Sequence, residues 1–90
     1  MTDITPDSVL TVSARVSIRP EPFGALLYHF GTRRLSFLKS PVLVDVVTEL
    51  DGTRCVGDAL TAAGVADDAR PGMLRALSTL CDSQMLEEAA

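Results

Sequence analysis

The hydrophobic pattern of the chain changes its period part-way along. In residues 14–19, which read ARVSIR, apolar side chains alternate with arginine and serine, and this period of two is typical of a strand with one buried face. Two further apolar runs, residues 25–30 and 34–38, flank a short turn that contains Gly31, which favours a β-hairpin. The three segments are therefore predicted to be strands, and the prolines of residues 20–22 are expected to end the first of them.

From residue 41 onward, apolar residues recur at the i, i+3, i+4, i+7 spacing of a helix. Ser40 and Pro41 supply a serine N-cap and a proline for the first helical turn, which together indicate a helix start. We predict helices over residues 41–51, 55–63 and 69–82. The resulting order, β-β-β-α-α-α, is that of an α+β fold with its strands first.

A length of 90 residues fits one domain with a small core. Residues 1–13 are polar, contain a proline and show no period, so we expect a mobile tail there and a single domain over residues 14–88. Residues 87–90 are expected to form an exposed end. The first residues lack the features of a signal peptide and no apolar run is long enough for a membrane span, so we expect a cytoplasmic protein that does not bind membranes.

Charge is distributed unevenly along the chain. The net charge is −4, yet residues 15–39 sum to +4 and residues 40–90 to −6. An acidic total disfavours general binding to nucleic acid. The basic strand region suits an acidic peptide partner, although solvated charges without a partner account for it equally well.

Few residues could carry catalysis. His29 is the only histidine, and no serine or cysteine stands at a recognised spacing from it. Cys55 and Cys81 are 26 residues apart and match no metal or redox motif. No glycine-rich loop has phosphate-binding spacing. We therefore expect neither an enzyme nor a protein with a metal or another cofactor of its own.

A small winged-helix DNA-binding regulator is an alternative, because the helices joined through Gly64 have helix-turn-helix proportions. A recognition helix needs several basic or amide side chains on its outer face. The third helix offers only Arg70, Arg75 and Gln84, opposed by three aspartates. A free-standing enzyme subunit is a weaker alternative.

Peptide binding by strand addition is the third possibility. If residues 34–38 lie at the edge of the sheet, an extended peptide could pair with their main chain. Arg34 and Lys39 flank the apolar residues of this strand, which is modest protection for an edge. An edge covered by the third helix is the alternative.

One long block carries a resemblance to a known family. It reads RPEPFGALLYHFGTRRLSFLKSP, followed by LVDVVTELDG. This block resembles the peptide chaperones of mycofactocin biosynthesis, which belong with the precursor-peptide recognition elements similar to the PQQ-biosynthesis chaperone. The likeness covers about residues 14–88. Gln84 stands where many of these proteins have a glycine turn.

The resemblance implies a three-stranded antiparallel sheet followed by a three-helix, winged-helix-like bundle. It also implies a non-catalytic role: binding the acidic leader of a ribosomally made precursor peptide (RiPP) and presenting it to a radical S-adenosylmethionine (SAM) maturase. The leader would pair with the third strand and lie in a groove against the third helix. The implied contact residues are Arg33, Arg34, Leu35, Ser36, Phe37, Leu38, Lys39, Arg70, Met73, Leu74 and Leu77. Arg33, Arg34 and Lys39 would steer the acidic leader.

Overall fold

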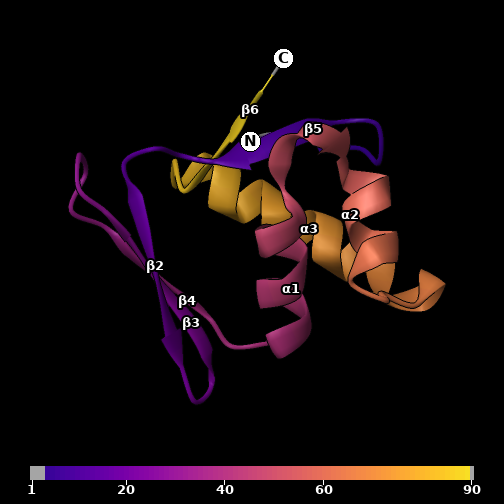
Figure 1. Ribbon diagram of the computed structural model, residues 1–90, viewed down its shortest axis with the longest axis horizontal. Coiled ribbons are helices and arrows are strands. Elements are labelled where there is room, and N and C mark those ends of the chain that lie inside the picture. Colours follow the sequence, from indigo (N-terminus) through magenta and orange to yellow (C-terminus); the bar gives the residue numbers. More distant parts are fainter. Residues whose placement is uncertain (1–3, 90) are drawn as a thin grey trace.

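A computed structural model describes residues 4–89 and shows two small antiparallel sheets with three α-helices between and beside them (Figure 1). The α+β class and the three helices agree with the sequence prediction. The elements in chain order are β1 (Val9–Val12), β2 (Val16–Glu21), β3 (Gly24–His29), β4 (Leu35–Leu38), α1 (Pro41–Glu49), β5 (Asp51–Cys55), α2 (Val56–Ala62), the 3₁₀ turn η1 (Asp67–Ala69), α3 (Arg70–Asp82) and β6 (Leu86–Glu88).

The three strands expected from the alternating pattern form one sheet in the order β2-β3-β4. Both strand pairs are antiparallel, and Leu26 lies opposite Arg19 on one side and Phe37 on the other. In Figure 1 this sheet extends from the left side of the molecule, away from α2. Only one of its faces packs against the helices, so the register decides which side chains are buried.

Strand β2 does not end at the prolines, as the sequence analysis expected, but runs through Pro20 to Glu21. The Phe30 N–H donates to the Arg15 carbonyl at 2.8 Å. Because bonded and non-bonded pairs alternate in an antiparallel ladder, the Pro20 nitrogen then faces the outer edge of the sheet. No ladder hydrogen bond is lost there, which is why the strand tolerates this proline.

A second sheet, in the order β5-β1-β6, was not predicted. It corrects the expected order of a sheet followed by a helical bundle, because β5 lies between α1 and α2 and β6 follows α3. Its central strand is Val9–Val12, part of the expected tail, and Leu10 in that strand is fully buried. Residues 1–3 of that tail and residue 90 at the other end lie outside the described residues.

The helices follow the predicted stripes with shifted ends. The Ser40 hydroxyl accepts a hydrogen bond from the Leu43 N–H at 3.3 Å, as the N-cap signal indicates. Helix α1 ends at Glu49 rather than residue 51, because Asp51 begins β5. Helix α2 begins after Cys55, whose side chain makes no capping hydrogen bond.

The buried core is aliphatic. It joins the inner face of the β2-β3-β4 sheet to the helices and to β1 and β6. Its largest fully buried side chains are Leu10, Leu27, Leu38, Leu60, Leu77, Met85, Leu86, Val46, Val47 and Val56. None of these is aromatic, and the three phenylalanines, Phe23, Phe30 and Phe37, are exposed.

Candidate functional site

Strand β4 is an edge of its sheet, with β3 on one side only. The His29 N–H donates to the Arg34 carbonyl at 3.0 Å, so the alternation of the ladder directs the main-chain groups of Ser36 and Leu38 towards β3. The N–H and C=O groups of Leu35 and Phe37 therefore face the open edge. Two donors and two acceptors are available there to a further strand.

The opposite edge of the same sheet is less suited to strand addition. Pro20 takes a position in β2 whose nitrogen faces outward, and proline has no N–H to donate. The Val16 N–H, which also faces outward, already donates to the Ser13 carbonyl at 3.0 Å. Only β4 offers an edge without a proline in this sheet, and it contains no charged residue of its own.

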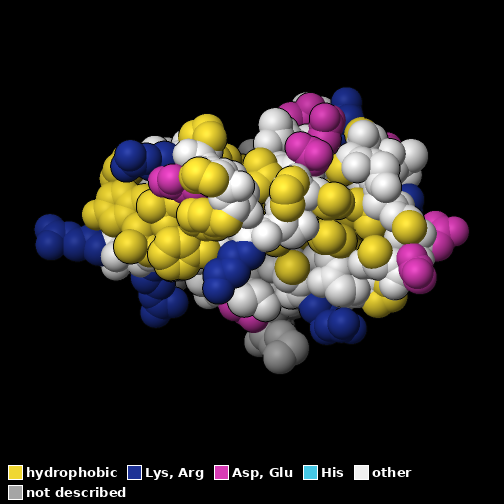
Figure 2. All heavy atoms as spheres, turned by 90° about the horizontal axis from the view of Figure 1, so that it is seen from below, with side chains coloured by type: hydrophobic (Ala, Val, Ile, Leu, Met, Phe, Trp, Pro, Cys, Tyr) yellow, Lys and Arg dark blue, Asp and Glu magenta, His cyan; other side chains and the backbone are white. Residues whose placement is uncertain are grey.

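The outer face of this sheet is apolar and exposed. Cross-strand pairing places Leu35 opposite Tyr28 and Phe37 opposite Leu26, and paired residues share a face. The Leu35 and Phe37 side chains are 54% and 57% exposed, whereas Leu38 on the inner face is 1% exposed. Figure 2 shows the resulting hydrophobic patch on the left, where the β2-β3-β4 sheet lies in Figure 1.

Two aromatic pairs extend this patch at its ends. The Phe23 and Phe37 ring centroids are 5.9 Å apart, and those of Tyr28 and Phe30 are 5.2 Å apart in an edge-to-face arrangement. Such offset and edge-to-face geometries are favourable for aromatic rings. Phe23, Phe37 and Lys39 together line a shallow apolar pocket. We define the outer face as Phe23, Leu26, Tyr28, Phe30, Leu35 and Phe37.

The predicted steering cations surround β4. Arg33 lies in the β3–β4 turn with a left-handed φ of 60°, Arg34 directly precedes the strand, and Lys39 directly follows it. All three are exposed, and none forms an ion pair with the described residues, whereas Arg19, Arg54 and Arg70 do. Their charge is therefore available to an acidic partner.

The four residues expected on α3 are not gathered on an exposed wall beside β4. Arg70 lies at the end of α3 next to α2, where its guanidinium donates to the Thr61 hydroxyl at 3.1 Å. Met73 and Leu74 are half-buried against the core, and Leu77 has no exposed surface. The helical spacing identified the core-facing stripe of α3, and a fully buried Leu77 is not accessible to a peptide in this structure.

Four residues of the outer face, Phe23, Leu26, Tyr28 and Phe30, were not among the site residues predicted from the sequence. Their pattern held one usable signal: all the aromatic residues of the chain fall between residues 23 and 37. Alternation alone could not say which face of the hairpin is exposed, because both faces of β3 are largely apolar. Contacts of Ala25, Leu27 and Leu38 with the core decide this.

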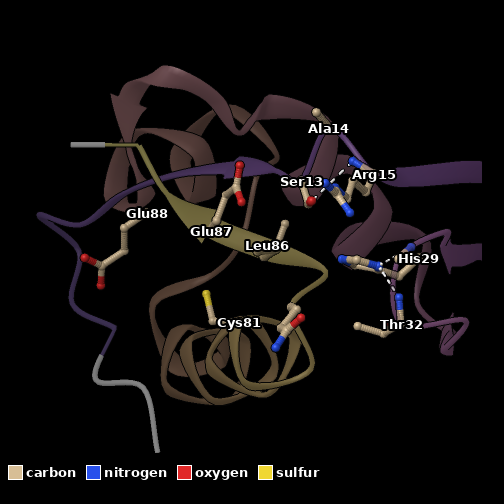
Figure 3. A pocket seen from close by; sticks show the side chains of 11 residues that line it. Ser13, Ala14, Arg15, His29, Thr32, Cys81, Leu86, Glu87 and Glu88 are labelled. Atoms are coloured by element: carbon tan, nitrogen blue, oxygen red, sulfur yellow. Dashed lines mark hydrogen bonds between the residues drawn. The ribbon is translucent and has the colours of Figure 1, made fainter.

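A separate cavity of about 770 Å³ lies between the start of β2, the β3–β4 turn, the end of α3 and β6 (Figure 3). His29 lies at one side and is 5% exposed. Its Nδ1 accepts hydrogen bonds from the Gly31 and Thr32 N–H groups, both at 3.0 Å. In the neutral ring this places the proton on Nε2.

The cavity does not present an activated nucleophile. Burial, followed by the nearby charges of Glu88 and Asp82, raises the pKa of the Cys81 thiol to about 11. The thiol is therefore protonated at neutral pH, whereas thiolate is the reactive form. Within residues 4–89, no cluster of histidine, cysteine and acidic side chains is suited to hold a metal ion.

Residues 10–87 match the model of the peptide chaperone MftB family. The chain belongs to this family. Residue 10 lies in β1 and residue 87 in β6, so the family match spans both sheets as well as the three helices.

Curated relatives agree with this assignment. The chain is 53% identical over 81 residues to the peptide chaperone MftB of Mycolicibacterium smegmatis, which covers 90% of the chain and 79% of the relative. It is 52% identical to the Mycobacterium ulcerans protein of the same name, over 90% of the chain and 74% of that protein. The Mycobacterium tuberculosis peptide chaperone MftB is 46% identical, over 93% and 77%. No solved structure matches the chain.

Membership of this family supports a general role as a peptide chaperone. The relatives are named as peptide chaperones, in line with the role that the resemblance seen in the sequence implies. No helix in the described part of the chain has the length and apolar character to cross a membrane.

Proposed function

We propose that this protein is a non-catalytic chaperone that binds the acidic leader of the mycofactocin precursor peptide as a fourth strand on β4 and presents it to a radical SAM maturase in the cytoplasm. The observation that carries the proposal is the open β4 edge, where the main-chain groups of Leu35 and Phe37 face outward. The same sheet has a proline at its other edge.

Strand addition at β4 has a simple geometry. The leader would exchange main-chain hydrogen bonds with Leu35 and Phe37, and its side chains would alternate between the two faces of the sheet. The leader side chains on the outer face would lie beside the exposed side chains of Leu35 and Phe37. On the inner face they would lie towards α1, which contacts both β3 and β4 and exposes Val42.

Burying two or three leucine-sized side chains contributes roughly 1.5–3 kcal/mol each. Ordering the peptide opposes part of this gain. The apolar contacts alone therefore supply less than the roughly 8 kcal/mol of a micromolar complex, and the main-chain hydrogen bonds to Leu35 and Phe37 must supply the rest. Such binding holds a substrate long enough for transfer and still releases it.

Charge supports an acidic peptide over a neutral one. Arg33, Arg34 and Lys39 surround the edge and are not paired with any described carboxylate. Exposed cations of this kind raise the association rate of an acidic ligand more than they raise its affinity.

Calorimetric titration of the chain with the acidic leader peptide tests the proposal. We expect saturable heat with a dissociation constant of about 0.1–10 µM. A peptide of the same composition in scrambled order serves as control and should bind much more weakly. Absence of heat and of saturation up to about 100 µM of leader would refute the proposed function.

A further inference from the structure

The outer face of the β2-β3-β4 sheet is the largest feature that strand addition leaves unexplained. Every aromatic side chain of the protein lies on it, and none lies in the core. Phe23, Phe30 and Phe37 are 40%, 59% and 57% exposed. Contiguous exposed apolar surface is costly in a small protein and marks an interaction site, and aromatic residues are enriched where binding energy is concentrated.

A peptide bound at β4 would not cover this face. Neighbouring strands are about 4.8 Å apart, and an added strand lies beside β4 in the plane of the sheet. The peptide side chains on the outer face would lie next to those of Leu35 and Phe37 and extend the apolar surface. Phe30, at the β3–β4 turn, and Tyr28, near the end of β3, would remain as exposed as before. The peptide therefore enlarges the apolar face and leaves it open to a third component.

The charges around the face indicate what that component is like. Arg19 lies on the outer face opposite Leu26, where it pairs with Glu21 at 3.4 Å while its side chain remains 76% exposed. Arg34 and Lys39 flank β4, and Figure 2 shows basic side chains around the yellow patch, with an acidic group at its upper edge. Face-to-face pairing of two copies would bring the two +4 segments of residues 15–39 together. Like charges in apposition are costly, which disfavours a second copy as the occupant.

We propose that the outer face is the docking surface for the enzyme that receives the peptide, through an apolar surface of that enzyme edged with acidic side chains. This inference rests on the proposed function. Because the outward side chains of the bound leader continue the face, the loaded chaperone presents a larger surface than the empty one. The enzyme therefore binds the loaded form more tightly, and by linkage it strengthens peptide binding by the same factor.

Serine variants of two rings at opposite ends of the face provide the test. Phe30→Ser and Phe23→Ser each remove an exposed ring that lies outside β4. Ile18→Ser is the matched control, because Ile18 is as exposed as Phe23, at 40%, and its pairing with Leu27 puts it on the opposite face of the same sheet. Circular dichroism establishes that each variant is folded. Binding of the maturase to fluorescently labelled chaperone is then measured with and without leader, and peptide affinity is measured by calorimetry.

We expect Phe30→Ser and Phe23→Ser to weaken maturase binding at least about tenfold while changing peptide affinity less than about twofold. Ile18→Ser should change neither, and leader should strengthen wild-type binding to the maturase. The proposal is overturned if the wild type does not bind the maturase, or if both phenylalanine variants bind it as the wild type does. It is also overturned if sedimentation shows a wild-type dimer that these variants dissociate.

The two proposals fail in different ways. If the wild type binds no leader, the proposed function fails. The role of the outer face is then tested by maturase binding to the chaperone without leader. Loss of that binding in Phe30→Ser and Phe23→Ser would support the docking face on its own. Normal leader binding together with unchanged maturase binding in these variants would overturn only the docking face.

Discussion

The ring of Phe37 in β4 packs against the ring of Phe23 in the β2–β3 turn, with centroids 5.9 Å apart. Both rings lie on the face of the sheet that the core leaves uncovered. The contact joins the β2–β3 turn to β4 on the outer face of the sheet.

Substitution of Gly24 should show how closely β3 and β4 approach next to this turn. A Cβ at this position would overlap the Leu38 carbonyl oxygen, and the φ of 147° suits glycine. We expect Gly24→Ala to lower the free energy of unfolding by at least about 2 kcal/mol, as measured by urea denaturation. Gly72→Ala is the control: its Cβ would have only an ordinary contact at 3.8 Å with Arg75, and it should change stability by less than about 1 kcal/mol. Equal effects would contradict the close approach.

The direction of the β4 main-chain groups can be tested with proline. The Leu35 N–H faces the open edge, so Leu35→Pro should leave the chain folded and weaken leader binding at least about tenfold relative to Leu35→Ala. The Ser36 N–H faces β3, so Ser36→Pro should instead destabilise the fold. Calorimetry and thermal unfolding distinguish the two effects. A folded Leu35→Pro variant with the affinity of Leu35→Ala would place the peptide elsewhere.

Electrostatic steering predicts a rate effect. Arg34→Glu combined with Lys39→Glu should slow leader association and flatten its dependence on salt between about 50 and 500 mM. Stopped-flow fluorescence with a labelled leader measures the rate. Arg75→Glu, on α3, should alter it far less. A wild-type association rate that does not change with salt would contradict steering.

Asp51 at the start of β5 should contribute to the pH dependence of stability. Hydrogen bonds from the Thr53 hydroxyl and the Thr53 backbone N–H lower the pKa of Asp51 to about 2. Because the folded-state pKa is below its ordinary value of 3.8, the carboxylate stabilises the fold above about pH 4, and this contribution is lost as the pH falls towards 2. Asp51→Ala should therefore be less stable than the wild type at about pH 6, with a gap that narrows at low pH. A gap independent of pH would contradict this role.

The parts of the fold that sequence predicted are those set by local signals. The hairpin over β3 and β4 follows from alternation around a turn, and Ser40 and Pro41 mark the start of α1. The second sheet depends on distant pairing: four residues of β1 pair with Asp51–Cys55 and with Leu86–Glu88. Strands of three to five residues have too little pattern of their own to be recognised without those partners.

The candidate site was predictable to a similar extent. The apolar strand 35–38 and its flanking cations were visible in the sequence, and the structure places them together at a sheet edge. The position of the α3 residues expected on the other wall of the groove could not be predicted in this way. A helical stripe has the same spacing whether it faces a ligand or the core. Leu77 illustrates this, since its position in the α3 stripe corresponds to full burial.

Amide hydrogen exchange, measured residue by residue by NMR with and without the acidic leader, tests whether the leader pairs with the open edge of β4. Strand addition at β4 should slow exchange at Leu35 and Phe37, whose N–H groups face the open edge. Ser36 and Leu38 should change little, because their N–H groups already face β3, and Ile18 at the opposite edge should not change. Saturable leader binding that leaves the Leu35 and Phe37 amides unprotected would contradict strand addition at β4.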